Sequence, residues 1–285
     1  MDMKPSPLYA RRYRANQIGV ALSMSAMVLG LVALLWILVV LFSNGFAALD
    51  FSIFTNDTPA PGSEGGGLRN AIVGSLLIVG LTVVVSTPVG ILAGVYLTEY
   101  GDTSKTAEFT RFITDIMLSA PSIVLGLFVY AIAVSTVGHF SGYAGSLALS
   151  LIAIPVVMRT TENMMRLVPG SLREAAFALG APRWKVATMV TLRAAKSGVI
   201  TGILLAVARI SGETAPLLFT ALNNQFFSTN MESPMANLPV VIFQFAMSPY
   251  ENWVRLAWAG ALLITLTVLL LNIVARVFFR EKVSA

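Results

Sequence analysis

The chain has 285 residues, of which 56% are hydrophobic and 12% are charged, and its mean hydropathy is +0.79. This composition excludes an ordinary water-soluble domain, because too little polar surface would remain to coat it. The net charge of +5 lies mainly in short segments between apolar runs, so it indicates membrane orientation and needs no nucleic-acid partner. No cysteine is present, and His139, expected in a short outer turn, cannot build a metal cluster alone.

Six apolar runs are candidates for membrane-spanning helices, which need about 20 predominantly apolar residues. The fourth run is short and the fifth is polar, so these two predictions are the weaker ones. We predict an all-α integral membrane protein with a single transmembrane domain over residues 18–280. The predicted spans are 18–42, 71–97, 113–137, 143–158, 197–218 and 258–279.

Basic residues mark the predicted cytoplasmic side, because short cytoplasmic loops carry an excess of lysine and arginine. Segment 159–196 is strongly basic, whereas segment 43–70 is acidic. Both termini, residues 1–17 and 281–285, are therefore expected in the cytoplasm. The first run is too long for the core of a cleavable signal peptide and is read as an uncleaved anchor. The basic residues near the two ends are Lys4, Arg11, Arg12, Arg14, Arg276, Arg280 and Lys282.

Two predicted spans contain features with two interpretations each. Ser119 and Ser122 flank Ala120 and Pro121 in the third span, which is either a broken helix whose freed backbone groups meet a solute or a packing kink. Asp115, near the inner end of that span, is expected to be a helix cap or a salt-bridge partner. Arg159, at the inner end of the fourth span, either helps an anion to leave or anchors the helix orientation.

The cytoplasmic segment 159–196 contains a predicted two-turn helix that begins at Ser171. Ser171 and Glu174 have the spacing of a capping box, and Gly180 is suited to a left-handed ending. The apolar members Leu172, Ala176 and Leu179 recur at spacings of four and three, so they share one face. Such a short helix is marginal alone, and it either lies at the lipid interface or inserts into a partner protein.

The fifth predicted span carries Arg209 and Glu213 in an otherwise apolar run. Arg209 would lie about 18 Å from the start of the span, where an arginine costs about 2.5–3.5 kcal/mol and normally faces a bundle interior or a wet cavity. The residues Gly198, Gly202 and Ala206 share its face, so we expect one close-packed stripe that faces the solute. A purely structural ion pair gains little, and a guanidinium suits phosphate or carboxylate oxygens.

Several motifs resemble a known family. Glu174, Ala175 and Ala176, followed after three residues by Gly180, resemble the EAA motif of importer-type ABC transporter permeases, although Arg193 stands where that motif has proline. Four further blocks are similar to the permeases of bacterial phosphate uptake systems. These blocks are 63–68, 118–124, 159–163 and 212–217.

The resemblance implies a permease of the bacterial inner membrane that forms half of the passage of an ATP-driven phosphate importer. Its partners would be a second permease (PstC-like), an ATPase dimer (PstB-like) and a periplasmic phosphate-binding protein (PstS-like). The chain has no phosphate-cradling loop, so ATP and Mg would bind the ATPase. The implied solute pathway is Arg209, Glu213, Arg159, Ser119 and Ser122; the implied ATPase contacts are Ser171, Leu172, Glu174, Ala175, Ala176, Leu179 and Gly180.

The outer loop before the second span contains Gly65, Gly66 and Gly67. These glycines either start the helix or, as the resemblance favours, shape a surface for the binding protein. Two alternatives to phosphate import stay open at this point. One is a permease for another oxyanion, such as sulfate or molybdate, and the other is a membrane scaffold or phosphate-sensing adaptor in which the pair of Arg209 and Glu213 is purely structural.

Overall fold

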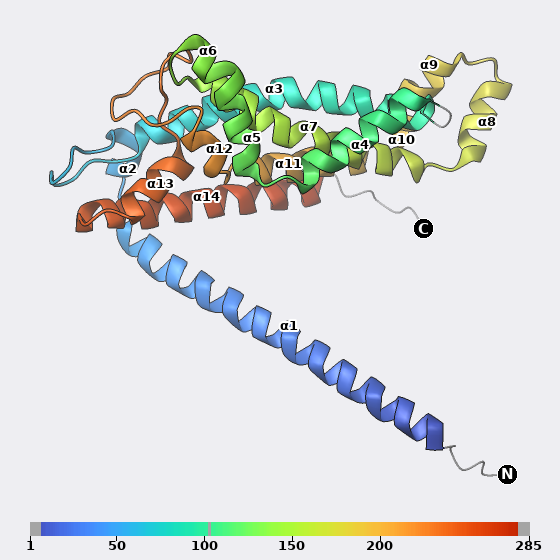
Figure 1. Cartoon of the computed structure of the whole chain (residues 1–285), viewed down its shortest axis with the longest axis horizontal. Coiled ribbons are helices and arrows are strands. Elements are labelled where there is room, and N and C mark those ends of the chain that lie inside the picture. Colours follow the sequence, from blue (N-terminus) through green and yellow to red (C-terminus); the bar gives the residue numbers. More distant parts are fainter. Residues whose placement is uncertain (1–6, 102–103, 279–285) are drawn as a thin grey trace.

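The computed structural model describes residues 7–101 and 104–278, and every regular element in these ranges is helical (Figure 1). Lys4, Arg280, Lys282, the last residue of the sixth predicted span and the predicted tail 281–285 lie outside the described residues. Four described helices are long and apolar enough to cross a membrane. Two further pairs of helices, each bent at a short break, bring the number of candidate spans to six if each pair counts as one.

Helix α1 (Pro7–Ala48) is the longest helix and runs away from the other helices over most of its length (Figure 1). It packs near its C-terminal end on α14 (Glu251–Phe278), where a Cβ at Gly45 would lie 2.7 Å from Cβ of Leu262. Both helices extend beyond the predicted spans. The free ends of α1 and α14 point toward the end of the molecule that carries α8 (Figure 1).

Helices α3 (Arg69–Glu99) and α7 (Gly142–Arg166) form the centre of the bundle. A row of residues at every fourth position of α3 is buried, and all but Ile78 are small or polar, which lets the two backbones approach closely. Polar bonds join the helices as well, since Oγ of Ser146 donates to the carbonyl of Ile78 at 3.1 Å. The row is Asn70, Gly74, Ile78, Thr82, Ser86, Gly90 and Gly94.

The glycines of α3 provide a test of this packing. A Cβ at Gly94 would lie 2.7 Å from Cβ of Thr161 and 2.8 Å from the carbonyl oxygen of Met158, whereas one at Gly80 would meet nothing within 4 Å. We expect Gly94→Ala to destabilise the protein by about 1–3 kcal/mol through overpacking, and Gly80→Ala to stabilise it by up to about 1 kcal/mol. Thermal unfolding of the two variants in detergent measures this. Equal melting temperatures would contradict the packing.

The third predicted span is a broken helix. Helix α4 (Lys105–Ser119) meets α5 (Ser122–Val129) at a bend of 107°, and the chain continues through η1 (Tyr130–Val134) and α6 (Ser135–Val137). Ala120 and Pro121 are extended, because the residue before a proline is disfavoured in the helical conformation. The helix is therefore broken here, and a role of its freed backbone groups toward a solute stays a prediction.

The fifth predicted span is interrupted, so the expectation of one helix over 197–218 is wrong. Helix α11 (Lys196–Ile210) ends before α12 (Ala215–Leu218) begins. Pro216 explains the interruption: it has no N–H to donate, and its ring would clash with the carbonyl of Gly212 in a continuous helix. Before α11, the elements α9 (Arg183–Lys185), η2 (Val186–Thr191) and α10 (Leu192–Ala194) form an arm bent by 72° against it.

The remaining helices include one that is longer than predicted and one that was not predicted. Helix α7 continues to Arg166, eight residues beyond the predicted fourth span, so residues 159–166 of the predicted cytoplasmic segment are helical. Helix α8 (Gly170–Ala178) lies at one end of the bundle and α2 (Ser52–Thr55) at the other (Figure 1). The sequence did not predict α13 (Leu238–Ala246), which packs on α14 and is capped by the Asn237 side chain accepting from the Val240 N–H at 3.1 Å.

Candidate functional site

Arg209 and Glu213 lie at the break between α11 and α12. Nε of Arg209 is 3.5 Å from Oε1 of Glu213, and the two side chains are 46% and 16% exposed. Ile210 belongs to the same buried cluster as Leu149 and Ile152 of α7, so the break lies about halfway along that helix. The guanidinium is thus paired within its own chain, at the depth of the bundle centre, and still has an open side.

The glycine end of the predicted solute-facing stripe is instead closed. Gly198 packs against Met164 and Gly202 against Thr160, so closely that neither position has room for a Cβ, and Ala206 is buried. This face holds α11 against α7. The close helix packing predicted at the two glycines is therefore confirmed, and the Arg209 end of the stripe is open; that this end faces a solute stays a prediction.

The two helix breaks are connected by packing. Helix α5 packs on α12, where a Cβ at Gly126 would lie 2.6 Å from Cα of Pro216. Ser119 is exposed at the end of α4 and donates to the carbonyl of Ile116 at 2.9 Å, while Ser122 is half-buried at the start of α5. Discontinuous helices at membrane depth are tolerated where they are buried in protein or line a wet cavity, which fits a solute passage at these breaks.

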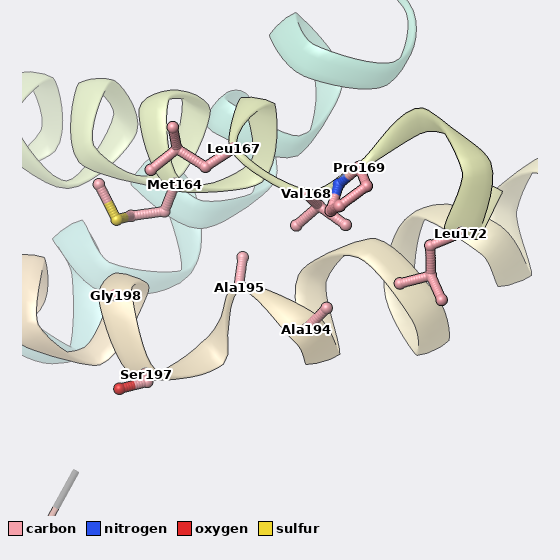
Figure 2. Close-up of a pocket in the computed structure, with 9 residues that line it drawn as sticks. All are labelled: Met164, Leu167, Val168, Pro169, Leu172, Ala194, Ala195, Ser197 and Gly198. Atoms are coloured by element: carbon pink, nitrogen blue, oxygen red, sulfur yellow. The ribbon is translucent and has the colours of Figure 1, made fainter. Parts of the chain in front are cut away.

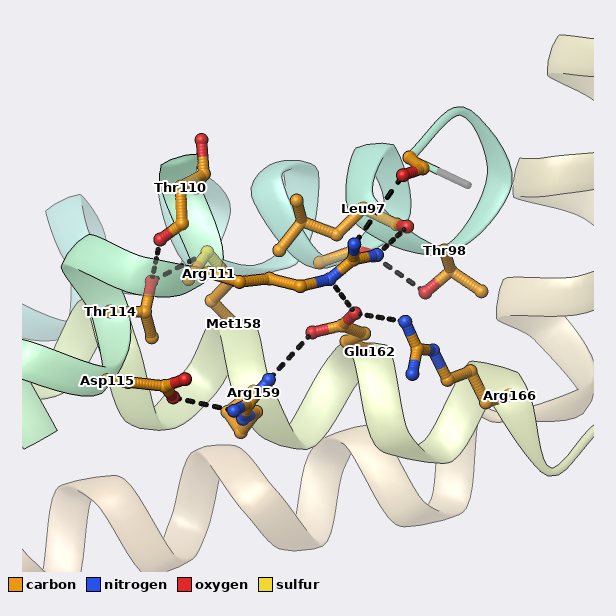
Figure 3. Close-up of polar contacts among 12 residues, drawn as sticks. Leu97, Thr98, Thr110, Arg111, Thr114, Asp115, Met158, Arg159, Glu162 and Arg166 are labelled. Carbon is orange, nitrogen blue, oxygen red and sulfur yellow. Dashed lines mark hydrogen bonds and ion pairs between the residues drawn. The ribbon is translucent and has the colours of Figure 1, made fainter. Parts of the chain in front are cut away.

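A network of charges surrounds Glu162 on α7 (Figure 3). The Glu162 side chain is 1% exposed, and its Oε1 lies 2.8 Å from Nε of Arg111 and 2.7 Å from Nη2 of Arg166. Arg159 reaches Oε2 of Glu162 at 3.5 Å and Oδ1 of Asp115 at 2.6 Å. Asp115 is thus the salt-bridge partner that was one of its two predicted roles, and Arg159 lies inside α7 with both of its ion pairs formed.

The roles of Arg111, Glu162 and Arg166 were not predicted from the sequence. A signal was present, because Arg159 and Arg166 stand three and four residues from Glu162 and thus share its helix face. Arg111 stands four residues before Asp115, so these two charged residues share one face of α4 in the same way. What the spacing could not show is that α4 lies against α7, which brings the two groups together.

Helix α8 ends as predicted but begins differently. Gly180 has φ +80°, its N–H donates to Phe177 at 2.9 Å, and the N–H of Ala181 donates to Ala176 at 3.2 Å, which is a left-handed helix ending. The predicted capping box is wrong. The helix begins at Gly170 with Pro169 as its N-cap residue and has no side-chain cap, and Ser171 and Glu174 are exposed inside its first turns.

Helix α8 presents apolar side chains that the chain itself leaves uncovered. Leu179 is 89% exposed, Leu172 43% and Phe177 44%, whereas Ala176 is half-buried. A cavity of about 370 Å³ lies at the base of the helix (Figure 2). It is lined by Met164, Leu167, Val168, Pro169, Leu172, Ala194, Ala195, Ser197 and Gly198.

The three glycines of the outer loop are not equivalent. Gly66 has φ +88° and packs against Pro59, and Gly67 is buried against the Asn56 backbone. Gly65, with φ +78°, has open space where a Cβ would be, and its carbonyl accepts from Nδ2 of Asn252 at 2.7 Å. Gly66 and Gly67 therefore shape the loop, Gly67 from a buried position, and a docking role of this loop stays a prediction.

Comparison with known proteins shows the family to which the chain belongs. A model of the family described as "Binding-protein-dependent transport system inner membrane component" matches residues 86–281. The phosphate transport system permease protein PstA of Yersinia pestis is 59% identical over 96% of this chain and 92% of the relative, and that of Haemophilus influenzae is 59% identical over 94% of both. The chain belongs to the PstA family of phosphate transport permeases. It is a multi-pass inner-membrane component of a binding-protein-dependent transporter.

Solved structures show the same fold. A chain of a bacterial alginate ABC transporter aligns with a TM-score of 0.63 at 15% identity, covering 95% of this chain and 96% of that one. A chain of the MetNI methionine ABC transporter aligns with a TM-score of 0.57 at 21% identity, covering 75% of this chain and 94% of that one. The PstA family therefore shares its helical architecture with ABC importers whose cargoes differ.

Proposed function

We propose that this PstA-family chain forms half of the passage through which phosphate enters the bacterial cell, with Arg209 attracting the anion. The observation that carries the proposal is the break between α11 and α12, where Arg209 lies at the bundle centre with its side chain 46% exposed. A guanidinium stays charged and offers a planar fork that suits phosphate oxygens. The membership in a phosphate-permease family supports phosphate over sulfate or molybdate.

Glu213 limits the strength of that attraction. Its carboxylate, 3.5 Å from Nε of Arg209, competes with the anion for the guanidinium, and a pore site must bind weakly enough to release its cargo. Phosphate near neutral pH still carries a proton and donates a hydrogen bond to a carboxylate. Sulfate is fully ionised and cannot do this, so Glu213 also favours phosphate.

Other predicted pathway residues take positions along the same route. Ser119 and Ser122, at the break between α4 and α5, line the passage where the α5 and α12 helices meet. Arg159 contributes on the cytoplasmic side, where the anion meets a guanidinium that two carboxylates already hold. At the opposite end, Gly65 belongs to the outer surface that meets the binding protein.

A binding-protein-dependent ABC transporter contains an ATPase and a binding protein. We assign the finer composition from the family resemblance: a PstC-like second permease, a PstB-like ATPase dimer that holds ATP and Mg, and a PstS-like binding protein. Helix α8 and both termini then lie in the cytoplasm, and α8 docks on the ATPase through Leu172, Phe177 and Leu179. The exposure of these three side chains supports this, because apolar side chains in water are otherwise covered.

The docking of α8 is tested with Leu179→Glu. We expect the variant to lose copurification of the ATPase and ATP-driven phosphate uptake by reconstituted vesicles, because a carboxylate would be desolvated in the interface. Leu8→Glu adds the same charge at an exposed position of α1 and serves as the control. Normal assembly and uptake by Leu179→Glu would contradict the proposed role of α8.

A further inference from the structure

We propose that Arg173 is a positioning residue that transmits the movement of α8 to α3 and α7 during transport. The proposal rests on the proposed role of α8 as the ATPase contact and goes beyond it, because docking alone does not say how a movement of this helix reaches the membrane-spanning helices.

The Arg173 side chain connects three helices. Its Nε lies 3.2 Å from Oε1 of Glu99 at the end of α3. Its Nη2 donates to the carbonyl of Met165, in the last turn of α7, at 2.8 Å, and its Nη1 donates to the carbonyl of Val168, in the turn between α7 and α8, at 3.0 Å. The guanidinium therefore contacts the ends of the two helices that form the bundle centre while its own backbone belongs to α8.

Within the described residues, few other contacts join α8 to the helices of the bundle centre. Helix α8 packs chiefly against η2, and in the part of the chain that the structure describes, Arg173 makes the side-chain hydrogen bonds that join α8 to other elements. The residues between α7 and α8 form a short turn over the cavity at the base of α8 (Figure 2). Without the guanidinium, α8 could tilt on this turn while α3 and α7 stayed in place.

The chemical groups around Arg173 favour a firm attachment of α8 to α3 and α7. The last carbonyls of a helix have no partner within the helix and carry partial negative charge, so a cation that donates to them is held firmly. Glu99 is 6% exposed and Arg173 21% exposed, and such partly buried charge-assisted bonds are stronger than solvated ones. The end of α3 is held from a second side as well, because Nη2 of Arg111 donates to the carbonyl of Leu97 at 2.8 Å.

The test is Arg173→Lys in the complete transporter reconstituted with its ATPase and binding protein. Lysine keeps the charge but cannot reach Glu99 and both carbonyls with one planar fork. We expect the complex to assemble and hydrolyse ATP, while the phosphate transported per ATP hydrolysed falls about tenfold. The control Arg193→Lys changes an exposed arginine of α10 and should leave this ratio unchanged.

Glu99→Gln provides a second variant that keeps an acceptor for Arg173 but removes the charge, and we expect a smaller fall in the same ratio. An unchanged ratio in both variants overturns the proposal. If neither variant assembles while Arg193→Lys does, Arg173 acts in folding and the proposal is also overturned. Failure of the proposed function is distinguishable, because then Leu179→Glu would retain the ATPase whatever Arg173 does.

Discussion

Substitution of Arg209 by glutamine is expected to abolish most ATP-driven phosphate uptake while leaving the transporter assembled. Arg209 is half-exposed at the helix break, so its removal costs little packing. Glutamine keeps hydrogen-bonding capacity but has no charge, and charge-assisted bonds to the anion contribute about 1.5–3 kcal/mol each, which corresponds to a loss of about 10- to 100-fold. Uptake of radiolabelled phosphate into vesicles that contain the whole complex measures the effect.

The matched control is Arg193→Gln, which removes an arginine that is exposed outside the proposed passage. Arg209→Lys keeps the charge without the planar fork, so its uptake should fall between the native protein and Arg209→Gln. If Arg209→Gln takes up phosphate at the native rate, and this uptake still depends on the ATPase, the pair of Arg209 and Glu213 has a purely structural role. Loss of assembly in that variant alone would do the same.

The sequence predicted the helical class and the approximate position of each span because hydrophobicity along the chain is a local property. The C-terminal end of α7 was not predicted, because hydrophobicity falls before the helix ends. Arg159, Glu162 and Arg166 lower the local hydropathy, whereas their pairing with each other and with Arg111 of α4 could not be read from the local sequence.

The candidate site was only partly predictable. Arg209 and Glu213 were identified because charges in an apolar run are costly, but Pro216 was not weighed as the end of α11. The capping box at Ser171 failed although its spacing was correct, since the helix already begins at Gly170 with Pro169 as its N-cap residue. Arg173 was counted only as a cytoplasmic basic residue, because nothing in the local sequence shows that Glu99 and the end of α7 lie beside it.

Substitution of Glu162 by glutamine is expected to have the largest effect on stability. Glu162 is 1% exposed and is the shared partner of Arg111, Arg159 and Arg166 (Figure 3). Glutamine has nearly the same shape but no charge, so Arg111 and Arg166 would lose their carboxylate partner and Arg159 would keep only Asp115. Hydrogen bonds to a charged group contribute about 1.5–3 kcal/mol each, and solvent screens part of the loss because the three arginines are 24%, 36% and 53% exposed. Thermal unfolding of the purified complex in detergent measures the effect.

Asp115→Asn is the matched control, because it neutralises a carboxylate of the same network that is 55% exposed and contacts Arg159 alone among these arginines. Exposed ion pairs contribute about 0–1 kcal/mol, so this variant should unfold close to the native temperature. Equal destabilisation by the two substitutions would show that the network acts through α4 and Arg159. A large effect of Glu162→Gln alone would instead place the stabilising contact at Glu162, where α4 is held against α7 through Arg111.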